Sequence, residues 1–224
     1  MAKKIGVITS GGDAPGMNAA VRAVTRYGIF LGYEMIGIRR GFKGLLEDEF
    51  YTLSLRSVSG IINAGGTVLH TGRCPEMKTQ SGMNRAVKTI KDLDLSGLIV
   101  IGGDGSLAAA NAISKRGIKV MAIPASIDND VCGTDETIGY DTALNTAVEA
   151  IDKIRDTATS HDRIFVVEIM GRSHGFLTLD VGIAAGCEFV VIPEVKHDIN
   201  KIARELKKGK ERGKTSEIIA FAEG

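Results

Sequence analysis

The chain alternates short apolar runs with longer amphipathic stretches. The apolar runs are rich in Val and Ile at consecutive positions, which is typical of strands buried on both faces of a sheet. Strands are predicted at Ile5–Thr9, Glu34–Ile38, Leu98–Ile101, Val120–Ile123, Ile164–Ile169, Phe189–Ile192 and Ile218–Phe221. Helices are predicted at Met17–Leu31, Asn84–Leu93, Ser106–Arg116, Tyr140–Ala158, Phe176–Ala185 and Ile199–Arg212. This alternation predicts an α/β fold with doubly wound, mostly parallel sheets.

The domain organisation follows from the length and from one long loop. A length of 224 residues allows one large domain or about one and a half. A glycine-punctuated loop over residues 133–139 meets a long predicted helix, so we expect a first domain at 1–138 and a second at 139–224. The last predicted strand runs almost to the end of the chain with no closing helix, and we expect a truncated chain whose second domain is incomplete.

Composition narrows the class of protein. A net charge of +1 gives no reason to expect binding to nucleic acid or to a membrane surface. The three cysteines, Cys74, Cys132 and Cys187, lie far apart without metal-ligand spacing, which argues against a zinc site and a disulfide framework. The apolar stretch at the N-terminus is too short for a signal peptide. A cytoplasmic protein is therefore expected.

A glycine-rich turn follows the first predicted strand. It reads Ser-Gly-Gly-Asp-Ala-Pro-Gly over residues 10–16 and opens a helix. Glycines allow close approach of backbone to a phosphate, and the helix N-terminus offers free N–H groups. The alternative is a tight turn without a ligand, but three glycines in six residues favour phosphate. Arg39 and Arg40 stand where a dehydrogenase would carry an acid for the ribose, so hydride transfer is disfavoured.

A second turn, Gly102-Gly103-Asp104-Gly105, also opens a predicted helix. A lone carboxylate in a phosphate cradle would repel the ligand unless it held Mg²⁺, which binds through one or two carboxylates together with phosphates. The alternative is that Asp104 or Ser106 only caps the helix. Capping leaves the three surrounding glycines unexplained, so the turn predicts a nucleotide's phosphates with a metal.

Two acids, Asp128 and Asp130, lie in the loop after the fourth predicted strand. In an arbitrary loop such acids are most often solvated. At the same sheet edge as two phosphate turns, they suit general-base chemistry and the positioning of metal or substrate.

Several motifs together resemble those of the bacterial ATP-dependent 6-phosphofructokinase family. They are, in order, SGGDAPGMN, GGDGS, SIDND with GTDETIGYDTA, MGRSHG and CEFVVIPE. The resemblance covers essentially the whole chain. It implies two Rossmann-like domains, and transfer of the γ-phosphoryl group of ATP to the 1-hydroxyl of fructose 6-phosphate with Mg²⁺.

The resemblance also implies roles for individual residues. The catalytic residues would be Asp128 as the base, with Ser126, Asp130, Arg172 and Gly12. ATP contacts would come from Gly12, Arg73, Cys74, Gly103, Asp104, Gly105 and Ser106, with Asp104 on the metal. Fructose 6-phosphate contacts would come from Ser126, Ile127, Asp128, Arg163, Met170, Gly171, Arg172 and Glu223. Arg163 matches a residue that reaches a neighbouring subunit, and the family is homotetrameric. Ser126 and Ala125 stand where the family usually has Thr and Gly.

Regulation and donor choice are implied in the same way. The i, i+4 pair Arg22 and Arg26 is by itself a solvated basic face. The resemblance adds it to an allosteric site for ADP and phosphoenolpyruvate, which would comprise Arg22, Arg26, Arg155, Gly186, Glu188, Arg212 and Lys214. Leu55 stands where that site usually has another arginine. Gly105 and Ala125 favour ATP, because pyrophosphate-dependent relatives commonly carry Asp and Lys there.

Three alternatives stay open at this point. Another kinase with a GGDG turn, acting on NAD or diacylglycerol, would explain residues 102–105 but not SIDND or MGR. A pyrophosphate-dependent enzyme is disfavoured by Gly105. A shortened, inactive chain that still binds nucleotide is the third.

Overall fold

The computed structural model describes residues 2–224, which divide into two compact units. Unit 1 extends to Ser126 and includes Asp130–Gly139, while unit 2 comprises Ile127–Asn129 and Tyr140–Gly224. The SIDND motif at residues 126–130 therefore belongs partly to each unit. Each unit has its own sheet and its own apolar core.

Unit 1 contains a five-stranded sheet with the order β3-β2-β1-β4-β5. Its strands are β1 (Lys4–Ser10), β2 (Glu34–Ile38), β3 (Phe50–Leu53), β4 (Leu95–Gly102) and β5 (Val120–Pro124). All neighbours pair in parallel except β3, which is antiparallel to β2. The carboxyl ends of β1, β4 and β5 consequently lie at one edge of the sheet.

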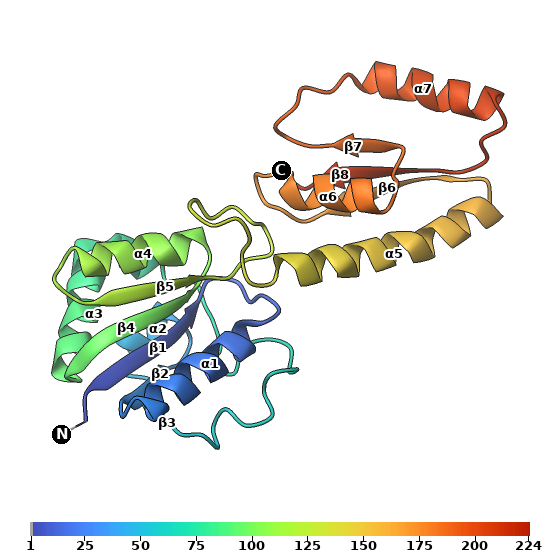
Figure 1. Ribbon diagram of the computed structural model, residues 1–224. Coiled ribbons are helices and arrows are strands. Elements are labelled where there is room, and N and C mark those ends of the chain that lie inside the picture. The colour runs from blue at the N-terminus through green and yellow to red at the C-terminus, as the bar shows by residue number, and fades with distance from the viewer. Residues whose placement is uncertain (1) are drawn as a thin grey trace. The chain divides into compact units, whose positions relative to one another are not determined.

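Helices cover both faces of this sheet (Figure 1). The helices of unit 1 are α1 (Met17–Phe30), α2 (Phe42–Leu46), α3 (Gln80–Asp92) and α4 (Asp104–Ser114), with a 3-10 helix η1 (Pro75–Lys78). One core packs Ile8, Ile38 and Val100 of the sheet against α2, α3 and α4. Side chains alternate along a strand, so neighbours such as Val7, also fully buried, face the opposite side, where α1 lies.

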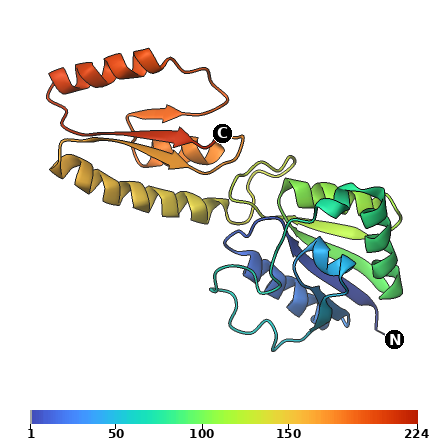
Figure 2. The same cartoon turned by 180° about the vertical axis from the view of Figure 1, so that it is seen from behind.

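Unit 2 contains a three-stranded parallel sheet, with the order β6-β8-β7. Its strands are β6 (Ile164–Ile169), β7 (Phe189–Val191) and β8 (Glu217–Ala222), and its helices are α5 (Tyr140–Ser160), α6 (Phe176–Ala184) and α7 (Ile199–Glu211). The core of unit 2 lies between the sheet and the helices α5 and α6. In Figure 2, α7 lies on the other side of the sheet from α5, and none of its residues is buried.

One expectation about unit 2 is wrong. The apolar runs predicted a sheet covered on both faces, yet Ile164 and Val166 are 51% and 64% exposed. These side chains alternate along β6 with Val167 and Ile169, which pack against the core. The face of Ile164 and Val166 lacks a packed helix among the residues described.

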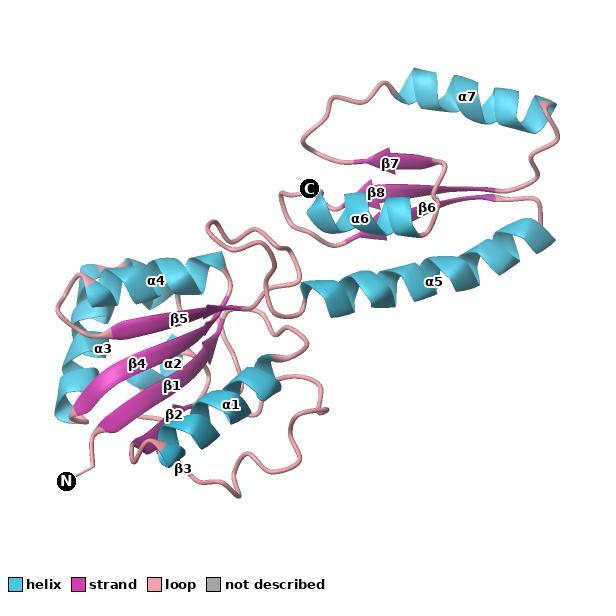
Figure 3. Ribbon diagram, in the orientation of Figure 1, coloured by secondary structure: helices cyan, strands magenta, loops and turns pink. Residues whose placement is uncertain are grey.

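The α/β class and the parallel sheets are confirmed, and all seven predicted strands are present (Figure 3). The sequence prediction missed β3, α2 and η1 and began α3 four residues late, at Asn84 instead of Gln80. Thr79 caps α3 by accepting a hydrogen bond from the Gly82 N–H at 3.1 Å. Gly82 had weakened the apparent helical pattern, since glycine disfavours helix interiors.

Candidate active site

Three motif turns begin at neighbouring positions of the unit 1 sheet. In the register of the parallel strands, Ser10 is the partner of Gly102, and Gly102 is the partner of Pro124. The SGGDAPGMN, GGDGS and SIDND segments therefore leave the sheet side by side. The side chain of Ser106 confirms the proximity of the first two, because its Oγ would lie 3.2 Å from a Cβ added to Gly11.

The glycines of these turns fall into two groups. Gly102 is required by the fold itself, since a Cβ there would lie 2.4 Å from the Ser10 carbonyl oxygen. Gly11 and Gly16 have φ of +94° and +93°, a region that L side chains rarely adopt. Gly12 and Gly105 differ, because an added Cβ would meet no atom of the described chain within 4 Å and their φ is not positive. The fold gives no steric reason for glycine at these two positions, so the open space suits a ligand.

The N-terminus of α4 has backbone N–H groups that no side chain caps, so it could bind an anion. Gly103 is its N-cap, and no side chain caps the helix. The structure thus does not support the capping alternative for Asp104, which is the first residue of α4 and is exposed. Free N–H groups at a helix N-terminus bind phosphate readily. Ser106 is 6% exposed and lies within the first turn of α4.

The acids of unit 1 fit a magnesium ion that arrives with phosphates. Among residues 2–224, no group of three or more His, Cys, Asp or Glu is arranged to hold a metal by itself. Asp104 offers one exposed carboxylate beside the phosphate turn, and Asp130 Oδ1 is buried without a hydrogen-bond partner. Mg²⁺ binds through one or two carboxylates with phosphates and waters, so this donor set suits it.

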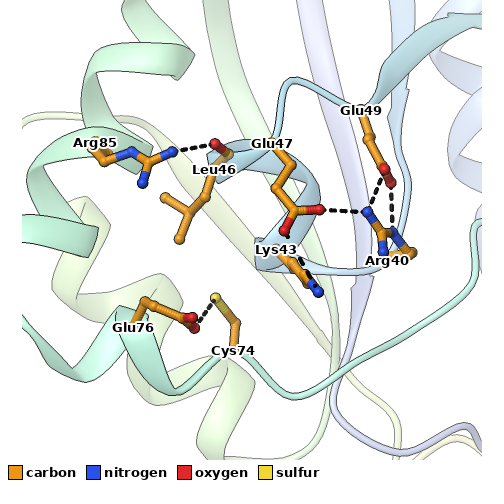
Figure 4. A network of polar contacts seen from close by, with 8 residues as sticks. All are labelled: Arg40, Lys43, Leu46, Glu47, Glu49, Cys74, Glu76 and Arg85. Carbon is orange, nitrogen blue, oxygen red and sulfur yellow. Dashed lines mark hydrogen bonds and ion pairs between the residues drawn. The ribbon is translucent and has the colours of Figure 1, made fainter.

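Arg73 and Cys74 lie at the end of a long loop that returns to the first turn. The Thr71 hydroxyl, two residues before Arg73, donates to the Gly11 carbonyl at 2.7 Å. Arg73 is exposed, whereas Cys74 is half-buried and its thiol donates to Glu76 Oε2 at 3.4 Å (Figure 4). Burial raises the pKa of the Cys74 thiol, with a smaller contribution from Glu76. The raised pKa disfavours the thiolate, so the surroundings of Cys74 do not activate it as a nucleophile.

Arg40 has a structural role, because its side chain and its backbone N–H connect neighbouring segments of unit 1. Its Nε donates to Glu49 Oε2 at 2.6 Å, and its Nη2 pairs with Glu47 Oε2 at 2.5 Å (Figure 4). Its backbone N–H donates to the carbonyl of Leu69 at 2.9 Å, so it also touches the loop that leads to Arg73. Arg40 thus ties the segment after β2 to that loop.

The predicted sugar-phosphate residues gather at the carboxyl edge of the unit 2 sheet. Ile169 is the register partner of Ala222, so residues 170–172 and Glu223 leave adjacent strands together. The N–H groups of Gly171 and Arg172 donate to Glu223 Oε2 at 3.3 and 3.2 Å. Arg172, at φ +53°, directs its Nε to Asp128 Oδ2 at 3.2 Å. The Asp128 side chain is 9% exposed.

Other predicted residues of the sugar set lie apart or contribute differently. Arg163 precedes β6 whereas Met170 follows it, so the two lie about 20 Å apart along the strand. Arg163 is therefore not part of the group around Arg172 within its own unit. Met170 is 61% exposed at the edge, and the Ser126 carbonyl accepts the Thr137 hydroxyl at 2.6 Å. Ile127 directly precedes Asp128 in unit 2.

Most predicted effector residues also gather in unit 2. Arg155 Nη2 donates to the carbonyls of Ala185 and Gly186 at 2.6 and 3.0 Å, and Lys214 lies 3.6 Å from Glu188. A cavity of about 250 Å³ is lined by Glu188, Phe189, Glu205, Gly209, Arg212, Lys214 and Glu217. Arg22 and Arg26 belong to α1 of unit 1. There, Arg22 Nη1 donates to the Val58 carbonyl at 2.5 Å.

These features define an α/β protein with a glycine-rich sheet edge, an uncapped helix N-terminus and a paired, buried carboxylate. The profile of the phosphofructokinase family matches residues 4–224, and the chain belongs to this family. It is 56% identical over 223 residues to the ATP-dependent 6-phosphofructokinase of Halothermothrix orenii, covering 99% of this chain and 67% of that relative. It is 52% identical to the protein of the same name from Bacillus subtilis, covering 99% of this chain and 70% of the relative.

Solved structures agree with this assignment. The phosphofructokinase of Saccharomyces cerevisiae superimposes with a TM-score of 0.92 at 36% identity, covering 99% of this chain and 34% of that much longer one. The match over the whole chain includes the SIDND and MGR motifs, which another GGDG kinase would leave unexplained. Separately, none of the helices formed by residues 2–224 is long and apolar enough to cross a membrane.

Glu194 was not predicted to matter, although it ends the CEFVVIPE motif. Its Oε1 accepts the Gly175 N–H at 2.8 Å, and Gly175 is the N-cap of α6, directly after the MGRSH segment. A Cβ at Gly175 would lie 2.4 Å from Ile192 Cβ, so the two loops are in close contact. This hydrogen bond lowers the pKa of the Glu194 carboxyl below its ordinary value of 4.5.

Because the pKa of Glu194 is lowered in the fold, the stability of the protein is expected to depend on pH through this residue. The charged form of Glu194 stabilises the fold above about pH 4.5, and this contribution is lost as the pH falls through the folded pKa. Glu194→Gln should therefore unfold at lower urea than wild type at pH 7, and the difference should shrink as the pH falls below 4.5. Glu149→Gln, at an exposed position of α5, is the control. A difference that stays the same as the pH falls below 4.5 would contradict this role.

Proposed function

We propose that the chain transfers the γ-phosphoryl group of Mg-ATP to the 1-hydroxyl of fructose 6-phosphate, giving fructose 1,6-bisphosphate and ADP. The open space at Gly12 and Gly105, beside an uncapped helix N-terminus, is the observation that carries the nucleotide assignment. The names of the relatives supply the donor and the acceptor. Because the chain spans 67–70% of those relatives, the activity is proposed from residues that this chain contains.

Unit 1 would bind ATP at the carboxyl edge of its sheet. The phosphates would lie on the N–H groups of Gly103, Asp104 and Gly105, with Gly12 opposite. Asp104 would hold the magnesium ion, and Asp130 has an unpaired buried oxygen available to it or to its water shell. When bound, the ion neutralises charge on the phosphate oxygens. Arg73 would add positive charge near the transferred group.

Unit 2 would bind the acceptor sugar and supply the general base. Asp128 would accept the proton of the 1-hydroxyl as that oxygen bonds to the γ-phosphorus and the bond to the β-phosphate oxygen breaks. Arg172 Nε lies 3.2 Å from Asp128 Oδ2 and so orients the carboxylate of the base. Phosphoryl transfer needs little covalent help from a protein, so such positioning accounts for much of the expected rate enhancement. Glu223 and Met170, at the same edge, would contact the sugar phosphate.

Regulation, assembly and location are part of the proposal. The cavity with Arg212 and Lys214 suits the phosphates of ADP or phosphoenolpyruvate, although Glu188, Glu205 and Glu217 also line it. Arg163 is exposed and remote from Arg172, which favours a role across an interface, in a homotetramer. Three free cysteines fit a reducing cytoplasm.

The base assignment is tested by Asp128→Ser. Sugar-dependent ADP release should fall about 10²–10⁴-fold, the usual contribution of a general base, whereas nucleotide binding to unit 1 should be unchanged. A coupled ADP-release assay with and without fructose 6-phosphate measures the first, and titration calorimetry with Mg-ADP the second. Asp152→Ser, at an exposed position of α5, is the matched control. An unchanged sugar-dependent rate would refute the assignment. If the wild-type chain binds nucleotide but releases no ADP, it is an inactive phosphofructokinase chain.

Donor choice is tested by Gly105→Asp. The added carboxylate would occupy the open space at the α4 N-terminus and repel the phosphates of ATP. We expect the KM for ATP to rise at least about tenfold, as one repulsive contact of 1.4 kcal/mol requires, with sugar-phosphate binding unchanged. Ala108→Asp adds the same charge at an exposed position one turn later in α4. Equal effects of the two substitutions, or no effect of either, would be incompatible with a phosphate site at Gly105.

A further inference from the structure

The loop between β3 and η1, residues 54–74, contains neither helix nor strand. Loops of this length without secondary structure are uncommon in compact domains and are usually functional. This loop ends in Arg73 and Cys74, the two residues assigned to ATP that lie outside the glycine turns. The contacts that hold this loop therefore determine the positions of the Arg73 and Cys74 side chains.

Two apolar side chains anchor the loop to the sheet. Val58 and Leu69 are both fully buried. Leu69 lies against β2, where a Cβ at Gly37 would be 2.9 Å from its Cδ2. The absence of a side chain at Gly37 therefore makes room for Leu69. These contacts fix the loop on the α1 face of the sheet but do not by themselves set the register of the residues that follow.

Asn18 helps to fix the position of the loop residues along the sheet. It is 3% exposed and is the second residue of α1, directly after the first phosphate turn. Its Nδ2 donates to the Ala64 carbonyl at 2.9 Å, and its Oδ1 accepts the Val68 N–H at 2.7 Å. One buried carboxamide thus satisfies two backbone groups four residues apart in the loop, which only a side chain with both a donor and an acceptor can do.

Hydroxyl groups continue the attachment toward Arg73. Thr9, near the end of β1, donates to the His70 carbonyl at 2.8 Å and accepts the Thr67 hydroxyl at 3.1 Å. Thr71 then donates to the carbonyl of Gly11 at 2.7 Å. These hydrogen bonds therefore attach the segment at Ala64, Thr67, Val68, His70 and Thr71, and the last of them reaches Gly11 two residues before Arg73.

We propose that Asn18 is a positioning residue for nucleotide binding, because it sets the register of the 64–71 segment and so holds Arg73 beside the Gly11–Gly12 turn. This role rests on the proposed function for the identity of the ligand. Asn18 does not touch the nucleotide and acts through Arg73. An apolar replacement leaves the Val68 N–H and the Ala64 carbonyl without their partner, so the segment can shift relative to the turn.

A double-mutant cycle tests the proposal with Mg²⁺ and a non-hydrolysable ATP analogue as the probe, because the analogue keeps the γ-phosphate that Arg73 would contact. By titration calorimetry well below the melting temperature, Asn18→Ala should weaken binding about tenfold, the scale of one lost contact to a charged group. The same change in an Arg73→Ala background should have less than about a twofold effect, since coupled residues are not additive. Asn18→Asp, which keeps the acceptor for Val68 but loses the donor to Ala64, should be intermediate. Asn84→Ala, at an exposed site on α3, should have no effect.

The outcomes separate this inference from the proposed function. If wild type fails to bind the magnesium complex of the ATP analogue, the proposed function and this role fall together. If wild type binds and Asn18→Ala binds equally well, or loses the same factor with and without Arg73, only the positioning role is overturned. A lower melting temperature with unchanged affinity overturns that role in the same way. Should Asn18→Ala not fold, Thr71→Val removes the last link to Gly11 and should show the same coupling to Arg73.

Discussion

The parallel pairing of β1 with β4 is the constraint on which the candidate nucleotide site depends. It places Ser10 opposite Gly102, and the pairing of β4 with β5 adds Pro124 to the same row. The strands approach so closely there that any side chain at Gly102 would collide with the Ser10 carbonyl. Backbone pairing alone therefore places the two glycine turns and the start of the SIDND loop next to one another.

The same principle operates in unit 2 with different chemistry. The pairing of β6 with β8 places Glu223 next to the turn at Gly171 and Arg172. Its carboxylate accepts hydrogen bonds from the N–H groups of both residues. This holds Arg172 in a left-handed conformation from which it reaches Asp128. A residue assigned to the sugar phosphate thus also shapes the turn that carries its neighbours. Under the proposed function, the Glu223 carboxylate would both bind the sugar phosphate and hold this turn, so a substitution there would affect both roles.

Much of this could be predicted from the sequence. Consecutive Val and Ile marked the buried strands, and glycines after strands marked the two turns that lie together at the sheet edge and are proposed to hold phosphates. The antiparallel strand β3 escaped prediction because it is a four-residue edge strand whose Phe50, Tyr51 and Thr52 are exposed, so it lacks the apolar run. The tasks of Asn18 and Glu194 also escaped, because each depends on which backbone groups the folded loop brings to its side chain. The uncovered face at Ile164 and Val166 escaped because an apolar run does not say which element covers it.

Amide hydrogen exchange, measured separately with Mg-ADP and with fructose 6-phosphate, shows whether each ligand binds at the sheet edge proposed for it. Mg-ADP is expected to slow exchange at residues 11–13 and 103–106 and to leave residues 170–172 unchanged. Fructose 6-phosphate should slow exchange at 170–172 and leave the two glycine turns unchanged. Nucleotide binding that protects residues 170–172 but neither glycine turn would contradict the assignment of the phosphates to the β1–β4 edge.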